Sequence, residues 1–326
     1  MIAGGREPAL SIVLATDRYE TIRPVVAHLR RQTVRDQLEL VLIGAFGSTP
    51  AAYAGELEGF AGVRIVEVDT VIPLARARAA GVRAASAPLV FIGETHSYAR
   101  PDCMEAFLRA HAGGWSVVVP GFANANPEGT LSWASFALDY GAWWEGLSPE
   151  GISFAPCYNV VCKRSVLLEF GDRLERVFSH GDEFLTGLRE RGHSISFEPA
   201  ASVAHLNGSN AATWRLRFIV GRVRGADRGA EWPTWRRVAY VLGSPLIPAV
   251  LFWRVRKPLA ALRARAGIPA GTSLVLGAIL AVTACGEMVG YAAGAGSEAE
   301  RRVDEFEIHK TRFVKRSHRP PPGDGP

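Results

Sequence analysis

The sequence predicts an α/β protein with a mostly parallel sheet flanked by helices, followed by a helical C-terminal region that associates with a membrane. Two observations support this prediction. Short apolar runs alternate with helical patterns over the first 120 residues or so, which is typical of a parallel sheet with crossover helices. From about Trp214 onward, long apolar runs interspersed with basic residues replace that alternation.

Five apolar runs are predicted to be strands. They cover residues 10–15, 38–43, 63–68, 88–92 and 115–119. The continuous apolar run at residues 10–15 is typical of a strand buried on both faces. Such sheets bind ligands at the carboxyl ends of their strands. Polar residues that directly follow these runs are therefore the candidates for function.

The segments between these runs carry the period of an amphipathic helix. In the first of them, Ile22, Val25, Val26 and Leu29 recur at the spacing of one helix face. Similar patterns predict helices near residues 74–85, 104–111, 165–170 and 182–191. A further strand is predicted to begin at residue 195 and to lead through Pro199 to His205.

Charge is distributed unevenly along the 326 residues. The net charge is +5, yet residues 214–266 hold 12 Arg and Lys against only Asp227 and Glu231. Because this basic block also contains long apolar runs, it suits an anionic membrane surface better than a nucleic acid. We therefore expect an anionic membrane surface as a partner and no nucleic acid.

Two other features favour the cytoplasm. The four cysteines form no CxxC pair and no zinc-binding spacing, so we expect them to be reduced and without a metal. The first apolar run, residues 10–14, is too short for a signal peptide and follows no basic segment.

Three domains are predicted: an α/β domain at residues 1–213, a basic and apolar helical region at 214–310, and a disordered tail at 311–326. Within the helical region, residues 238–253 are apolar but contain Pro245 and Pro248. Residues 273–294 have about the ~20 residues that cross a hydrocarbon core, although they include Glu287. Two membrane-embedded or interfacial helices are expected, with a soluble apolar packing domain as the alternative.

Short motifs occur in a fixed order along residues 8–210. The first strand ends at Thr16, and a Gln32-Thr33 pair precedes the second strand. The helix near residue 77 begins Ala-Arg-Ala-Ala-Gly, and the fourth strand runs into Glu94-Thr95-His96. Asn159 lies four residues before Lys163-Arg164, and Asp182-Glu183 precedes Gly192, Pro199 and His205.

This order resembles the GT-A glycosyltransferases of the family 2 type, and Gly286–Tyr291 (GEMVGY) is similar to the membrane-associated tail of some bacterial members. The resemblance implies a transferase that uses a nucleotide-sugar donor. The DxD metal motif of this family corresponds to Glu94-Thr95-His96. The histidine that family members carry near the end of the domain, close to the diphosphate, corresponds to His205.

The chemistry of such a transfer explains these residue types. A divalent cation neutralises the charge that develops on the diphosphate, and it is held by carboxylate oxygens. Glu94 supplies such an oxygen, and His96, two residues on in an extended segment, points to the same side. With His205 they form the predicted site for Mn²⁺ or Mg²⁺. The alternative is the polar end of a strand.

The resemblance also implies contacts with the donor. Arg78 and Thr95 are expected at the nucleotide or its diphosphate, and Thr16 and Asp17 near the base and ribose. Glu183 is the predicted general base that takes the proton of the acceptor hydroxyl, with Asp182 as its alternative. Acidic residues at a helix start also complement the helix dipole, which is a purely structural explanation for this pair.

Two departures from the family pattern bear on specificity. Where members carry Asp-Asp after the second strand, this chain has Gly44-Ala45, so the nucleobase is not predicted. The metal motif has one carboxylate in place of two or three.

The sequence therefore predicts an inverting, metal-assisted glycosyltransferase at the cytoplasmic face of the cell membrane, acting on a lipid-linked or cell-envelope glycan acceptor. The alternative is a non-catalytic GT-A-like protein that binds a nucleotide sugar, a glycan or a partner in an envelope assembly. A soluble nucleotidyltransferase is disfavoured, because no Gly-rich phosphate loop with a lysine occurs near the N-terminus.

Overall fold

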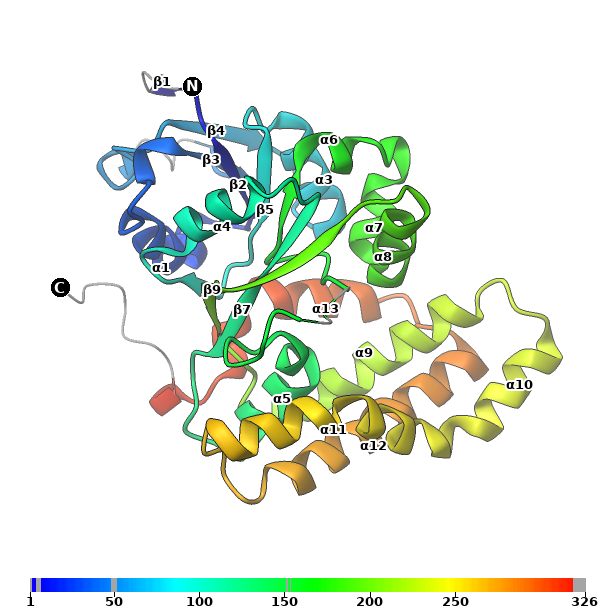
Figure 1. The fold of residues 1–326 in the computed structure, drawn as a ribbon. Coiled ribbons are helices and arrows are strands. Elements are labelled where there is room, and N and C mark those ends of the chain that lie inside the picture. The colour runs from blue at the N-terminus through cyan, green and yellow to red at the C-terminus, as the bar shows by residue number, and fades with distance from the viewer. Residues whose placement is uncertain (1, 4–6, 48–51, 151, 153, 319–326) are drawn as a thin grey trace. The chain divides into compact units, whose positions relative to one another are not determined.

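The computed structural model describes residues 2–3, 7–47, 52–150, 152 and 154–318 (Figure 1). The chain divides into two compact units. The first unit comprises Met1–Ala123 and Trp143–His205, and the second comprises Asn124–Ala142 and Leu206–Pro320. The main unit boundary thus follows His205, and the predicted domain limit at residue 213 stays a prediction.

The first unit is built on a nine-stranded sheet with the order β1-β4-β3-β2-β5-β8-β7-β9-β6. The central strands are parallel: β2 pairs with β3 and β5, and β3 pairs with β4. The strands are β1 (Ile2–Ala3), β2 (Leu10–Ala15), β3 (Leu38–Gly44), β4 (Gly62–Glu67), β5 (Leu89–Ile92), β6 (Ser97–Ala99), β7 (Val117–Asn124), β8 (Val161–Lys163) and β9 (Ile195–His205).

The predicted fold class is confirmed, because the sheet is mostly parallel around β2 and helices flank it. The sheet is nevertheless mixed. Strand β8 pairs antiparallel with both β5 and β7, and β6 pairs antiparallel with β9. Every side chain of β2 and β3 is buried, as the continuous apolar runs predict for strands covered on both faces.

The helices of the first unit are α1 (Tyr19–Arg30), α3 (Leu74–Ala84), α4 (Cys103–His111), α6 (Arg164–Leu168), α7 (Leu174–Ser179) and α8 (Gly181–Glu190). Helix α3 packs on β2 and β3, whereas α4 packs on β9. Gly81 permits the close approach of α3 to the sheet, because a Cβ at this position would lie 2.5 Å from Val13 and 2.7 Å from Ile43.

The second unit is helical. It contains α5 (Thr130–Asp139), α9 (Ala212–Gly229), α10 (Thr234–Gly243), α11 (Ile247–Arg265), α12 (Thr272–Ala293) and α13 (Ala299–Ile308). Helices α9 and α12 pack against each other (Figure 1), and glycines line this contact. A Cβ at Gly221 would lie 2.1 Å from the carbonyl oxygen of Thr283, and one at Gly290 would lie 2.2 Å from that of Arg222.

Two segments of this unit are long and apolar enough to cross a membrane, residues 234–265 and α12. Residues 310–318 contain two short 3-10 helices, Lys310–Phe313 and Arg316–His318. The rest of the predicted disordered tail, residues 319–326, lies outside the described residues.

Candidate metal and nucleotide-sugar site

Glu94 and His96 follow β5 directly, at its carboxyl end. His205 is the last residue of β9. The antiparallel pairing of β6 with β9 sets Ser97 opposite His205, and this brings the two histidines together although 109 residues separate them. All three predicted ligands are buried, with 1–3% of each residue exposed.

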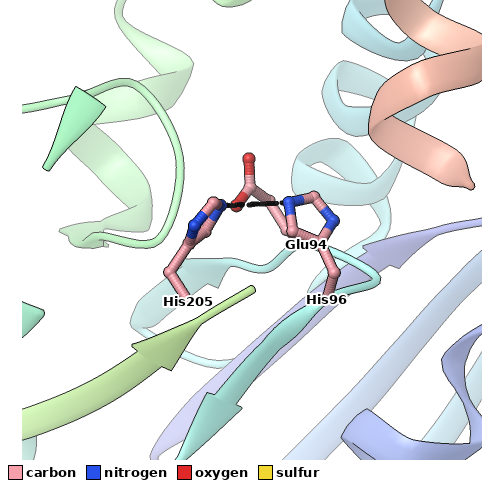
Figure 2. Close-up of side chains that lie close together, drawn as sticks. All are labelled: Glu94, His96 and His205. Atoms are coloured by element: carbon pink, nitrogen blue, oxygen red, sulfur yellow. Dashed lines mark hydrogen bonds and ion pairs between the residues drawn. The ribbon is translucent and has the colours of Figure 1, made fainter. Parts of the chain in front are cut away.

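The three side chains point toward one another (Figure 2). The Nε2 atoms of His96 and His205 lie 3.1 Å apart, and each lies 3.5 Å from Oε2 of Glu94. Their candidate ligand atoms all lie within 4.8 Å of one another, and among the described residues this is the one such group of His, Cys, Asp and Glu.

These spacings fit a shared cation. Metal–ligand distances of about 2.1 Å place two ligand atoms about 3.0 Å apart at a right angle and about 3.4 Å apart at the tetrahedral angle. The donor set also fits, because imidazole nitrogen suits transition metals and carboxylate oxygen suits Mn²⁺ and Mg²⁺. The residues present are therefore able to hold a divalent cation.

Electrostatics favour the ionised form of Glu94. Burial alone raises the pKa of this carboxyl group, but His96, His205 and then Arg78 outweigh that effect and hold the pKa well below its usual value. A buried carboxylate is costly unless it is paired. Glu94 is therefore a buried carboxylate held by its neighbours and not the solvated end of a strand.

Asn159 fixes the orientation of Glu94. Its Nδ2 donates hydrogen bonds to Oε2 of Glu94 at 2.5 Å and to Oγ of Ser97 at 2.9 Å. Ser97 Oγ in turn donates to the same Glu94 oxygen at 3.1 Å. Asn159 is fully buried, and its backbone has a positive φ of 52°, a conformation that asparagine adopts more readily than most residues.

From the sequence, Asn159 was identified only as part of a motif, and Ser97 was not identified as a functional residue. An asparagine shortly before a predicted helix is a weak signal, because such residues are common in turns. The role of Asn159 becomes visible only when β8 pairs with β5. Its backbone N–H donates to the carbonyl oxygen of Ile92 at 2.6 Å, which carries the side chain to Glu94.

Arg78 lies in the same neighbourhood. Only 6% of the residue is exposed, and its guanidinium stacks over the ring of Tyr158 at 4.4 Å. Its Nε atom is buried and has no hydrogen-bond partner. An unpaired buried donor costs about 1–3 kcal/mol, so this position suits a ligand that supplies acceptor oxygens.

Comparison with known proteins finds no protein-family model and no curated sequence that match the chain. Solved structures do match. The mannosyltransferase PcManGT from Pyrobaculum calidifontis, in complex with GDP-Man and Mn²⁺, is 17% identical with a TM-score of 0.52, over 90% of this chain and 88% of that one. This likeness, together with the sheet, decides the fold.

The protein has the GT-A glycosyltransferase fold. Weaker matches include TarS 1–349 from S. aureus in complex with UDP, which is 11% identical with a TM-score of 0.47, over 87% of this chain and 90% of that one. GalNAc-T7 with UDP, GalNAc and Mn²⁺ is 15% identical with a TM-score of 0.45, over 63% of this chain and 46% of that one.

In this GT-A fold, Thr16 and Asp17 lie at the carboxyl end of β2. The hydroxyl of Thr16 donates to the carbonyl oxygen of Arg18 at 2.9 Å, and Asp17 accepts from Thr21 at 2.9 Å. Thr95 is buried, and its hydroxyl lies 3.2 Å from Nδ1 of His96. Thr95 thus positions an imidazole, and its predicted contact with the donor stays a prediction.

Packing explains the missing carboxylate after β3. A Cβ at Gly44 would lie 2.5 Å from the backbone oxygen of Thr16 and 2.8 Å from the ring of Phe46. A side chain is therefore excluded at Gly44. Glu67 on the neighbouring strand β4 brings a carboxylate to this edge, where it accepts a hydrogen bond from the backbone N–H of Phe46 at 3.1 Å.

Asp182 and Glu183 lie in the first turn of α8. Nε of Arg176 donates to both oxygens of Glu183, at 2.7 and 3.0 Å, whereas the side chain of Asp182 is exposed. The start of α8 lies beside the segment that carries Asn159, because a Cβ at Gly181 would lie 3.6 Å from the Sγ of Cys157. The assignment of either residue as the base stays a prediction.

Proposed function

We propose that this protein is a glycosyltransferase that moves a sugar from a nucleoside-diphosphate donor to a lipid-linked or cell-envelope glycan acceptor, with inversion and with the help of a divalent cation. The convergence of Glu94, His96 and His205 is the observation that carries this proposal. Three buried ligands with the right spacing, at the carboxyl ends of strands in a GT-A fold, suit a cation that binds a diphosphate.

The cation that suits this site best is Mn²⁺. Mg²⁺ prefers an all-oxygen shell and keeps several waters, whereas two imidazoles and one carboxylate suit a first-row transition metal. Mn²⁺ is present in the related mannosyltransferase structure. When bound, the cation would neutralise charge on the leaving diphosphate.

The protein's own residues have distinct tasks in this proposal. Asn159 and Ser97 hold the Glu94 carboxylate in place. Arg78 binds phosphate oxygens through its buried guanidinium, and Thr16 and Asp17 border the nucleoside. Glu183, or Asp182 beside it, accepts the proton of the acceptor hydroxyl as that oxygen attacks the anomeric carbon.

The basic and apolar second unit supports action at a membrane. We propose that it holds the protein at the cytoplasmic face of the cell membrane, close to a lipid-borne acceptor. Residues 214–266 carry 12 basic residues against two acidic ones, a balance that favours an anionic lipid surface.

A second candidate function is a non-catalytic GT-A protein that binds a nucleotide sugar or a glycan. The ion pairs of Glu183 with Arg176 and Arg173 favour it, because these contacts occupy the carboxylate oxygens that would otherwise face an acceptor hydroxyl.

One experiment separates the two functions. The purified protein is incubated with a panel of GDP- and UDP-sugars and Mn²⁺, and both donor binding and nucleoside-diphosphate release are measured. Release that stops on chelation of the cation supports the transferase. Donor binding without release from any donor supports the binding protein, and neither binding nor release contradicts both.

A further inference from the structure

The most exposed large hydrophobic side chains of the described residues lie in α10, in the short 3-10 helix Ser244–Leu246 that joins it to α11, in α11 itself and at the start of α12. Leu242 and Leu246 are 75% and 68% exposed, and Trp235 and Trp253 are 72% and 64% exposed. Six of these side chains recur at spacings of three and four residues, which places them on one face of a helical segment. This apolar stripe consists of Trp235, Val238, Leu242, Leu246, Val250 and Trp253.

Positive charge accompanies the stripe. Residues 234–265 contain seven Arg and Lys and no Asp or Glu. An arginine directly follows each terminal tryptophan, as Arg236 and Arg254. Tryptophan and arginine at the ends of an apolar stretch are typical of the boundary between lipid head groups and acyl chains.

The packing of the second unit argues against a membrane-spanning arrangement. Helices α10 and α11 both pack on α12, and α12 packs on α9 through the glycine contacts described above. Helix α9 carries five arginines, of which Arg215, Arg224 and Arg228 are exposed. If α12 crossed a bilayer, these guanidinium groups would lie at membrane depth, where arginine is strongly disfavoured.

The single acidic residue of α12 gives the same result. Glu287 is only 2% exposed. Its carboxylate lies 3.8 Å from Nη1 of Arg228 on α9 and accepts the hydroxyl of Tyr291 at 3.3 Å. Helix α12 therefore directs its charge into the helical unit, as a core helix does.

We propose that α10 and α11 lie in the plane of an anionic lipid surface, with the apolar stripe inserted among the head groups, and that α12 is a core helix of the second unit rather than a membrane span. This inference rests on the membrane association in the proposed function and specifies how the attachment is made. The ligand is the negatively charged lipid surface itself.

The first test measures attachment. Full-length protein is sedimented with vesicles of phosphatidylcholine alone or of phosphatidylcholine with 30% phosphatidylglycerol. We expect binding to the anionic vesicles, a loss of at least tenfold in L242E/L246E, and a loss of about fivefold per charge removed in R254Q/R256Q/K257Q. Leu168→Glu, at an exposed leucine of the first unit, is the matched control and binds as the wild type does.

The second test measures depth. A fluorophore is attached to Leu246→Cys in a Cys285→Ser background, because the other three cysteines are buried, and it is quenched by lipids labelled at shallow or deep positions. Shallow quenching is the expected result. Deep quenching would show that residue 246 reaches the bilayer centre, as in a span, and would overturn the in-plane arrangement.

The outcomes separate this inference from the proposed function. Equal binding to neutral and anionic vesicles, or unchanged binding by L242E/L246E, overturns the anionic docking surface. Nucleoside-diphosphate release in detergent tests the transferase independently, and L242E/L246E retains it. Vesicle binding without release leaves the docking surface intact and counts against the transferase.

Discussion

The cluster of Glu94, His96 and His205 and the acidic pair Asp182-Glu183 differ in every physical respect that bears on function. The cluster is buried, and hydrogen bonds from Asn159 and Ser97 fix its carboxylate. The acidic pair lies at a helix start, with Asp182 exposed and Glu183 held by arginines. The cluster is thus organised before any ligand arrives, whereas Glu183 must give up its ion pairs before it can contact a substrate.

This difference shows how far the structure supports each assignment. A buried carboxylate is costly unless it is paired and hydrogen-bonded, and the cluster meets that need with its own neighbours in a geometry that is able to hold a cation. Surface acids in ion pairs cost little and contribute little, so the pair is explained without any function. The predictions below test this contrast, from the largest expected effect to the smallest.

Glu94→Gln is expected to have the largest effect. The amide removes the only carboxylate of the cluster, so Mn²⁺ binding falls below detection and turnover falls about 10³-fold. Mn²⁺ binding is measured by calorimetry and turnover by nucleoside-diphosphate release. Glu190→Gln, at the far end of α8, is the control. A variant that binds Mn²⁺ as tightly as the wild type does would remove Glu94 from the cation site.

Glu183→Gln is expected to lower turnover about 10²-fold while leaving Mn²⁺ affinity unchanged, because a general base acts on the acceptor and not on the cation. Asp182→Asn, measured in the same assay, decides which member of the pair is the base. Full turnover in both variants would show that the pair is a structural feature of the start of α8.

Asn159→Gly is expected to weaken Mn²⁺ binding about tenfold. Glycine tolerates the positive φ of this position, so the variant removes the amide without straining the backbone. The dissociation constant is measured by calorimetry, and Asn210→Gly in the second unit serves as the matched control. An unchanged dissociation constant, with an unchanged melting temperature, would show that Glu94 does not depend on the amide.

Glu39→Gln is expected to have the smallest effect, a loss of about 1–2 kcal/mol of unfolding free energy at neutral pH, with Mn²⁺ affinity unchanged. Glu39 is also a buried carboxylate, but its bonds are structural: it accepts from Ser11 Oγ at 2.5 Å and from the backbone N–H of Ser86 at 2.8 Å. A fall in Mn²⁺ affinity would contradict this separation of roles.

The pH dependence of unfolding sharpens the same point. Burial raises the pKa of Glu39. The hydrogen bonds from Ser11 and Ser86 and the contact with Arg64 lower the pKa by more than burial raises it, so the pKa lies below its ordinary value. The stabilisation is complete above the ordinary carboxyl pKa and is lost as the pH falls through the lowered one. Denaturant titrations in acid should show this loss in the wild type and not in Glu39→Gln.

The sequence alone determined the longer strands and helices of the first unit but not the short elements β6, β8 and α7. The apolar runs at residues 10–15 and 38–43 became β2 and β3, because a strand buried on both faces needs no polar alternation. Helix periodicity placed α1 and α4 in the same way. Strand β8 was not predicted, since three residues are too few to show a strand pattern, and its antiparallel pairing with β5 and β7 is known only from the structure.

Site chemistry shows the same division. Residue type and strand position were enough to select Glu94 and His96, which are neighbours along the chain. Only the tertiary structure brought the Nε2 atom of His205 within 3.1 Å of that of His96, through the pairing of β6 with β9. In the same way, the pairing of β8 with β5 brought Asn159 to Glu94. These residues are 109 and 65 positions apart in the sequence. Long-range pairing is set by the packing of the whole sheet, and no local pattern encodes it.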